Sequence, residues 1–351
     1  MFRLRSGVDW FISTIGEIII YPTFGQSQYN ISSYQLTYTY ILKLLESGIS
    51  TSSIANYVSK FPNDKVIVPF FTFLVNKNLI VNRKTSSCLS AWQLELYSRQ
   101  IAAFEQIEPP QDSVKMQELL AISRVCIIGC GGIGAPVAEM LAASGVGFFT
   151  LIDGDQVELS NLGRQIAYSV DDLHTNKVDA LSRRLRKINP LCKIRRVPLF
   201  MDAANAAALL KDANIIVVAA DSPMPDLLNW IELLCSASCL NTPYIVASNS
   251  WPTIRVGPLF LPKEGQSYSN YRKSLKYRWP QAALYEQECS NKQISKGTTV
   301  CACYATGSLV ANAVINYLTR SPHMLAGQSL LLDINTLERK TPFTSGEGVT
   351  Q

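Results

Sequence analysis

One short stretch, Val125 to Gly134, restricts the folds open to this chain more than any other. It reads VCIIGCGGIG, an apolar run followed at once by a glycine-rich turn and then by a helical pattern. Glycines directly after a buried strand allow a tight turn, and they let the backbone amides at a helix start approach a phosphate. The stretch therefore predicts the first strand–loop–helix unit of a Rossmann-like sheet that binds a nucleotide.

The same alternation of strand and helix patterns continues to residue 249. We expect strands at 124–129, 147–153, 193–199, 213–220 and 243–249. We expect helices at 132–144, 175–188, 203–212, 227–238 and 301–318. This order predicts an α/β domain with a mostly parallel sheet, to which 252–262 adds a strand of different orientation. The polar segment 264–300 is expected to be a long loop that covers the active site.

The first 84 residues have a different texture, rich in Tyr, Ile, Ser and Phe. Strand patterns at 17–23 and 27–33 are followed by helical patterns at 33–47, 50–61 and 65–76 and by a short terminal strand. This order predicts a small winged-helix-like α+β domain. The expected domains are 1–84, a linker with a helix at 85–115 that carries the YSRQ motif, and the nucleotide-binding domain at 116–351.

Composition excludes several classes of protein. The net charge of +5 is too mild for a nucleic-acid-binding protein. We find no apolar run of about 18 residues and no signal peptide, which predicts a cytoplasmic protein that does not cross a membrane. The nine cysteines are scattered and form no CxxC pair, so neither a disulfide framework nor a zinc site is expected.

The residues after the glycine-rich loop indicate which nucleotide binds. Asp153 ends the next strand, where a carboxylate can accept hydrogen bonds from ribose. Arg164 and Lys177 follow, and they suit a triphosphate, which carries more charge than the two phosphates of NAD. Asp221 ends the fourth strand, where a carboxylate beside phosphates would hold magnesium. We expect Lys177 and Asp221 to be exposed in a cleft.

Each of these side chains also has a simpler interpretation. Arg164 or Lys177 alone is more often a solvated charge, and Asp221 alone is more often a helix N-cap. An NAD-dependent oxidoreductase also remains an alternative, although it does not need these three residues together. Their convergence on one glycine-rich loop favours ATP and magnesium.

The motifs GCGGIG, LIDGDQVELSNLGRQ, Lys177 and AADS resemble the adenylating domain shared by the ThiF and MoeB sulfur-carrier activators and the ubiquitin-activating enzymes. The resemblance implies that a carboxylate attacks the α-phosphorus of ATP. Asp221, Arg164, Lys177 and Arg99 would be the catalytic residues, with Arg99 of the YSRQ motif reaching across a homodimer. The nucleotide-binding residues would be Gly129, Gly131, Gly132, Gly134, Asp153, Asp155, Asn161 and Gln165.

The chain also departs from the sulfur-carrier activators of this family. It lacks their zinc cysteines, and its N-terminal domain is similar to the peptide-recognition module (PqqD-like) of enzymes that modify ribosomally made peptides. The whole chain resembles the enzymes that act on the microcin C and pantocin A peptides. This resemblance implies that a precursor peptide binds to the N-terminal domain and is activated at a glutamate side chain or at its C-terminal residue, which leads to condensation or cyclisation.

Three points stay open at this level. The N-terminal domain could serve dimerisation or packing alone, and the substrate could instead be a sulfur-carrier or ubiquitin-like protein that ends in Gly-Gly. A non-catalytic scaffold is disfavoured because the whole nucleotide-binding set is present. Cys289 lies where some relatives carry a thioester-forming cysteine, but no base is visible near it in the sequence.

Overall fold

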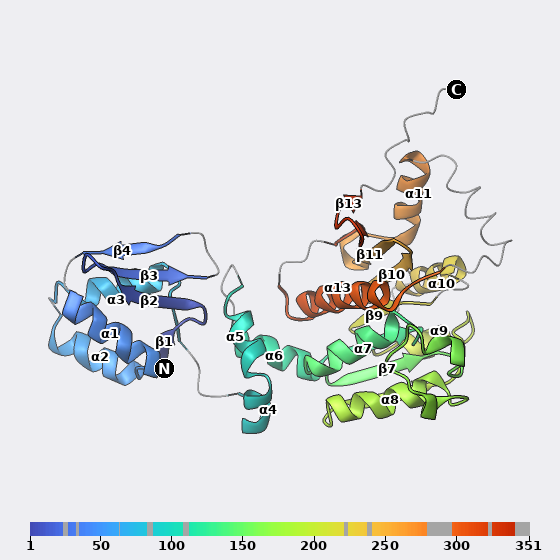
Figure 1. Cartoon of the computed structure of the whole chain (residues 1–351), viewed down its shortest axis with the longest axis horizontal. Helices are drawn as coiled ribbons and strands as arrows, with labels where there is room; N and C mark the ends of the chain where they lie inside the picture. The colour runs from blue at the N-terminus through green and yellow to red at the C-terminus, as the bar shows by residue number, and fades with distance from the viewer. Residues whose placement is uncertain are drawn as a thin grey trace. The chain divides into compact units, whose positions relative to one another are not determined.

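The computed structural model describes residues 1–23, 27–32, 35–62, 64–82, 87–107, 112–220, 224–236, 241–278, 297–321 and 325–340. The chain forms two compact units, Met1–Glu118 and Leu119–Gln351 (Figure 1). The narrower boundaries expected at residues 84 and 115 stay a prediction.

The second unit is built on an eight-stranded sheet in the order β13-β12-β11-β10-β9-β6-β7-β8. The five strands β10, β9, β6, β7 and β8 are parallel to one another, and β11, β12 and β13 pair in antiparallel fashion. The strands are β6 (Arg124–Ile128), β7 (Phe148–Ile152), β8 (Lys193–Val197), β9 (Ile215–Val218), β10 (Tyr244–Ser250), β11 (Thr253–Phe260), β12 (Leu330–Asp333) and β13 (Arg339–Lys340). The mostly parallel Rossmann-like sheet predicted from the sequence is confirmed.

The register of the parallel strands aligns their carboxyl ends. Ile128 at the end of β6 pairs with Ile152 of β7 and with Val218 of β9. In the same row, Ile152 pairs with Val197 of β8. The residues that follow these strands therefore meet along one edge of the sheet, which is where open α/β sheets bind ligands.

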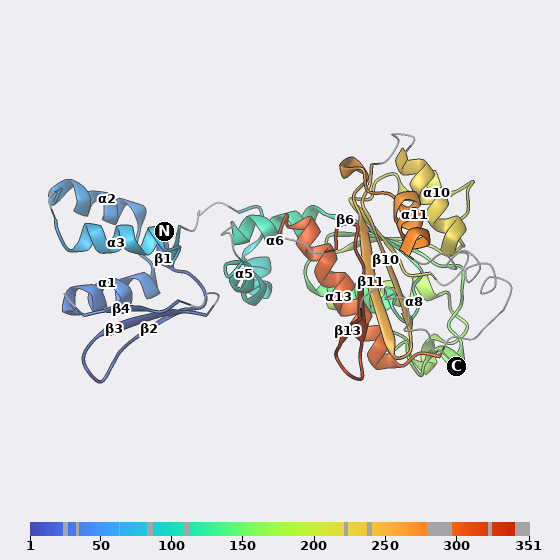
Figure 2. The same cartoon turned by 90° about the horizontal axis from the view of Figure 1, so that it is seen from above.

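Helices cover both faces of this sheet (Figure 2). Helix α13 packs against α7 and against β10 and β11, and α7 also packs against α8. Figure 2 shows α13 on one side of β10 and β11 and α10 with α11 on the other. The helices are α7 (Gly134–Ala143), α8 (Lys177–Ile188), α9 (Ala206–Leu210), α10 (Met224–Ser236), α11 (Tyr268–Arg278) and α13 (Val300–Leu318), with short 3-10 turns at Leu159–Asn161, Val170–Asp172 and Pro262–Glu264.

Alternating side chains of the central strands are buried on the two faces of this sheet. Cys126 and Ile128 of β6 pack with Leu209 of α9 and with Leu228 and Ile231 of α10. Val125 and Ile127 alternate with them and are also buried, as expected for a strand covered on both faces. This double coverage explains why β6 reads as a continuous apolar run.

The first unit has the helices and strands expected for a winged-helix-like domain, together with two strands that the sequence analysis missed. β1 pairs with β5, and β2, β3 and β4 form a three-stranded antiparallel sheet. Its elements are β1 (Phe2–Leu4), β2 (Val8–Ile12), β3 (Ile18–Pro22), β4 (Tyr29–Ile31), α1 (Gln35–Ser47), α2 (Thr51–Lys60), α3 (Ile67–Asn76), β5 (Ile80–Asn82), α4 (Ala91–Leu96) and α5 (Ser98–Phe104). Helix α6 (Ser113–Ile122) begins in this unit and ends in the second. β1 and β2 were missed because charged residues interrupt their apolar pattern.

A buried charge cluster ties the N-terminal strands to the segment after α5. The carboxylate of Glu105 accepts hydrogen bonds from Arg3 Nη2 at 2.5 and 2.6 Å and from Ser6 Oγ at 2.6 Å. Arg5, which is fully buried, donates to the backbone oxygens of Glu105 and Ile107. Buried charges are stable when they are paired and hydrogen-bonded in this way, so the segment after α5 is anchored to the N-terminal strands.

Two expectations about the second unit need correction. The polar segment 264–300 is not a continuous loop, because residues 268–278 form α11; residues 279–296 lie outside the described ranges. Helix α13 is long and apolar enough to cross a membrane by length and composition alone, although the sequence analysis found no such segment. Its Ala302, Val310 and Val314 are buried within the unit.

Candidate nucleotide-binding site

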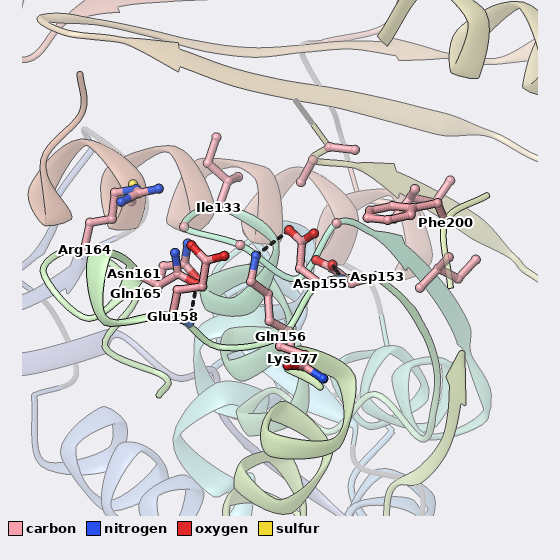
Figure 3. A pocket seen from close by; sticks show the side chains of 18 of the residues that line it. Ile133, Asp153, Asp155, Gln156, Glu158, Asn161, Arg164, Gln165, Lys177 and Phe200 are labelled. Carbon is pink, nitrogen blue, oxygen red and sulfur yellow. Dashed lines mark hydrogen bonds and ion pairs between the residues drawn. The ribbon is translucent and has the colours of Figure 1, made fainter. Parts of the chain in front are cut away.

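A cavity of about 610 Å³ opens where the parallel strands end (Figure 3). Residues that follow β6, β7, β8, β9 and the start of α8 contribute its walls. The lining residues are Ile128, Gly129, Gly131, Gly132, Ile133, Ile152, Asp153, Asp155, Gln156, Glu158, Asn161, Arg164, Gln165, Lys177, Leu199, Phe200, Met201, Ala219, Ala220, Leu227, Asn249, Thr298 and Cys303.

The glycine-rich loop needs glycine at two positions for different reasons. Gly129 has a φ of +88°, and a Cβ there would lie 2.7 Å from the carbonyl oxygen of Ala219. A Cβ on Gly134 would lie 1.8 Å from the carbonyl oxygen of Gly129. Gly134 is not among the residues that line the cavity, and its lack of a side chain lets α7 pack closely on the loop. Its contact with the nucleotide stays a prediction.

Asp153 orders the loop from within. Its two carboxylate oxygens accept hydrogen bonds from the backbone amides of Cys130 at 2.7 Å and Asp155 at 2.8 Å. Burial raises the pKa of the Asp153 carboxyl, and the nearby Lys177 ammonium opposes that rise. Each oxygen retains a lone pair and the residue lines the cavity, so Asp153 can still accept a hydrogen bond from ribose.

Lys177 is buried rather than exposed, which corrects the expectation. Its Nζ lies 2.7 Å from Oδ2 of Asp155, and its side chain is 8% exposed against 52% for Asp155. A backbone clasp brings the two together, because the amide of Lys177 donates to the carbonyl of Asp155 at 3.0 Å and that of Val157 donates to the carbonyl of Thr175 at 2.9 Å. Lys177 therefore reaches the cavity in a fixed position.

In Figure 3, Asn161, Arg164 and Gln165 lie on the side of the cavity away from Phe200. The Oδ1 of Asn161 accepts from the amide of Glu158 at 3.1 Å, and Arg164 Nη1 donates to the carbonyl of Ser160 at 3.0 Å. Gln165 is buried, and its Oε1 has no hydrogen-bond partner in the described structure. Buried amide groups are normally paired, so Gln165 points to a ligand at this end.

The other end of the cavity is apolar. Leu199, Phe200 and Met201 follow β8, and Leu227 comes from α10. Phe200 is 63% exposed, and its ring lies so close to Gly154 that a Cβ there would meet it at 2.7 Å. An exposed aromatic ring in a cavity wall offers a flat apolar surface on which a base can stack.

Several lining or supporting residues were missed by sequence reasoning. The hydroxyl of Tyr168 donates a hydrogen bond to the carbonyl of Cys130 at 2.5 Å and so holds the glycine-rich loop in place. Asn249 and Thr298 lie near the Sγ of Cys303, at 3.6 and 3.7 Å. Asn249 carried a signal in the sequence, because it lies at the carboxyl end of a parallel strand, β10. Leu199, Phe200 and Met201, which follow β8, carried the same signal.

Besides Gly134, three predicted residues are not placed in this cavity. Asp221 and Cys289 lie outside the described residues. Arg99 is exposed on α5, which belongs to the first unit. The structure does bring together Gly129, Gly131, Gly132, Asp153, Asp155, Asn161, Arg164, Gln165 and Lys177.

Comparison with known proteins agrees with this geometry. The profile of the ThiF family matches residues 97–346. The sulfur carrier protein adenylyltransferase of Thermus thermophilus is 34% identical over 130 residues, which are 37% of this chain and 46% of that protein. The chain spans about half the length of the curated relatives that it matches.

Two solved structures share the fold over nearly the whole chain. PaaA superposes with a TM-score of 0.74 at 23% identity and covers 96% of this chain and 98% of its own. MccB of E. coli, solved with AMPCPP and MccA, superposes with a TM-score of 0.73 at 22% identity and covers 99% of this chain and 98% of its own. The similarity therefore includes the N-terminal domain as well as the sheet domain.

Proposed function

Because the chain belongs to the ThiF family, we propose that it is an ATP-dependent adenylating enzyme that acts on a ribosomally made precursor peptide. An oxygen of a peptide carboxylate attacks the α-phosphorus of ATP, the bond to the bridging oxygen breaks, and pyrophosphate leaves. A second nucleophile then attacks the acyl carbon of the acyl-adenylate and AMP leaves, in a condensation or cyclisation of the kind that makes peptide antibiotics such as pantocin A.

The observation that carries this proposal is the division of the cavity into an apolar end and a cationic end. We place the adenine against Phe200 and Leu199, the ribose at Asp153 and the phosphates toward Lys177 and Arg164. The two phosphates of a dinucleotide carry less negative charge than a triphosphate, so a triphosphate is the better partner for the buried ammonium of Lys177. Lys177 and Arg164 would stabilise the charge that builds up on the phosphates as pyrophosphate leaves.

Magnesium is assigned to a residue outside the described ranges. Within those ranges no group of three or more His, Cys, Asp or Glu side chains is arranged to hold a metal ion. Asp153 already binds two amides and Asp155 binds Lys177. We therefore propose that Asp221, together with the phosphates, holds the magnesium, which would supply further positive charge at the phosphates.

The first unit offers a surface suited to an extended peptide. β4 ends the three-stranded sheet, since among the described strands it pairs with β3 alone. Such an edge can bind a peptide by strand addition, through main-chain hydrogen bonds. MccB, which shares this domain arrangement, is described as a microcin C7 biosynthetic enzyme and was solved with MccA, which supports a peptide as the substrate class.

The dimeric state in this proposal rests on the family resemblance. We propose a homodimer in which Arg99 of each chain reaches the nucleotide of its partner. We also retain the cytoplasmic location and the missing zinc site as predictions. The second candidate function is activation of a sulfur-carrier or ubiquitin-like protein that ends in Gly-Gly, and the similarity to the Thermus sulfur-carrier enzyme favours it.

ATP–pyrophosphate exchange tests the proposal directly. We expect exchange that depends on a precursor peptide encoded beside the gene, and a higher KM with similar kcat when the leader part of that peptide is removed. Exchange stimulated only by Gly-Gly carrier proteins would favour the second candidate. NAD reduction without ATP consumption would contradict both.

Lys177→Ala provides the matched test of the site. We expect exchange to fall by at least about 100-fold, because the phosphates lose a buried cation. Lys187→Ala, an exposed lysine in the last turn of the same helix, should exchange like the wild type. Equal activity of the two variants would remove Lys177 from the site.

A further inference from the structure

Asp155 has a different environment from the other residues predicted to bind the nucleotide. Its Oδ2 accepts a hydrogen bond from the Lys177 ammonium at 2.7 Å, and its own amide donates to Asp153. Its side chain is half exposed at the cavity, whereas that of Lys177 is buried. Figure 3 shows this ion pair between Arg164 on one side and Phe200 on the other. With the phosphates placed toward Lys177 as proposed, Asp155 occupies the position at Lys177 that a phosphate oxygen would take.

The carboxylate of Asp155 has a physical reason to be there when the cavity holds no nucleotide. A buried ammonium without a counter-ion is costly. Asp153 is a poor substitute, since both its oxygens accept backbone hydrogen bonds and burial raises its pKa. The carboxylate of Asp155 neutralises the Lys177 ammonium, and it is exposed enough to be hydrated when the pair breaks.

We infer that Asp155 is a resident counter-ion of Lys177 that the phosphates of an incoming nucleotide must displace. The inference rests on the proposed function and reassigns Asp155 from a nucleotide ligand to a positioning residue that acts through Lys177. With phosphates bound, Asp155 loses its partner and lies beside like charge, which opposes binding. When pyrophosphate leaves, Asp155 regains Lys177, which favours release.

The test is a set of binding titrations on the full chain by isothermal calorimetry, with ATP, ADP and adenosine as probes. For Asp155→Asn we expect ATP to bind about five- to tenfold more tightly than to the wild type, because one opposing charge is removed. ADP should follow in the same direction with a smaller effect, and adenosine should bind unchanged. The dependence of log Kd for ATP on log salt concentration should also become steeper.

Asp179→Asn is the matched control. Asp179 lies in the first turn of the helix that begins with Lys177, pairs with Arg196 Nη1 at 2.8 Å, and does not line the cavity. Its replacement removes the same charge from a position close to the site, so ATP binding by this variant should equal that of the wild type. Equal tightening in both variants would reveal a general charge effect and overturn the inference.

Other outcomes also decide the matter. Unchanged or weaker ATP binding by Asp155→Asn, while the wild type binds ATP, overturns the role of Asp155 and leaves the proposed function standing. Weakening seen only with magnesium, and lost in EDTA, would make Asp155 a metal ligand and likewise overturn the inference. A wild-type chain that binds no ATP would overturn the proposed function itself.

Discussion

At the scale of single residues, the candidate site depends on a few positions where geometry leaves little choice. Gly134 is the clearest, because the first turn of α7 passes against the carbonyl of Gly129 with no room for a methyl group. Asp153 and Tyr168 fix the same loop by hydrogen bonds to the backbone of Cys130. The packing of α7 and the hydrogen bonds of Asp153 and Tyr168 therefore fix the loop without a bound phosphate.

Gly134→Ala should destabilise the protein by about 3 kcal/mol or more, because its Cβ would overlap a backbone oxygen that cannot move freely. Chemical denaturation monitored by circular dichroism measures this. Gly163→Ala is the control, since a Cβ there meets nothing within 4 Å, and it should change stability by less than about 1 kcal/mol. Similar denaturation midpoints for the two variants would show that α7 does not pass the loop so closely.

At the scale of secondary-structure elements, Glu118 of α6 holds the start of α4 in place. Its Oε1 accepts hydrogen bonds from the amide of Cys88 at 2.8 Å and from Ser87 Oγ at 2.9 Å. Burial alone would raise the pKa of Glu118, but these hydrogen bonds and Lys115 outweigh it and lower the pKa from 4.5 to about 2. α4 itself begins with a capping box between Ser90 and Gln93.

A lowered pKa in the folded state means that ionised Glu118 stabilises the fold above pH 4.5, and that this stabilisation is lost as the pH falls toward 2. Glu118→Gln should therefore cost about 1 to 2 kcal/mol at pH 7 and nothing near pH 2. Urea unfolding at several pH values measures the difference. Glu95→Gln, an exposed position on α4, is the control, and a difference for Glu118→Gln that does not vary with pH would refute the assignment.

At the scale of the whole molecule, the proposal requires two chains for each complete site. If Arg99 acts across a homodimer, Arg99→Ala and Lys177→Ala chains are each inactive alone but complement each other. Random mixing at equal amounts makes half of the dimers mixed, and each mixed dimer has one intact site, so about one quarter of the wild-type exchange should return. Peptide-dependent exchange after unfolding and refolding of the mixture measures it.

Activity that stays absent from the mixture would place Arg99 and Lys177 of one chain in the same site. An Arg99→Ala chain that is active alone would place Arg99 in no site. A mixture of Arg99→Ala with wild-type chains serves as the control for losses during refolding. The experiment tests the dimer proposal separately from the ATP site. In the proposal, Lys177→Ala disables the site of its own chain, whereas Arg99→Ala disables the site of the partner chain.

The sequence by itself determined the kind of elements and the edge of the sheet at which the site lies. Apolar periodicity and glycines are local signals, so β6, β7, β8, β9 and β10 and the helices between them were predictable. A parallel sheet then aligns the strand ends, which brings Gly129 and Asp153 to one edge without further information. α11 was missed because a polar, surface helix carries little apolar periodicity.

Only the tertiary structure decided how the side chains at that edge use one another. Lys177 and Asp155 are 22 residues apart in the chain, and their pairing depends on a backbone clasp that no local pattern encodes. Cys303 meets Gly132 because α13 packs on α7, and Phe200 lies on Gly154 because β8 pairs with β7. Burial and partner choice are set by packing between distant segments, and so they follow from the fold rather than from the order of residues.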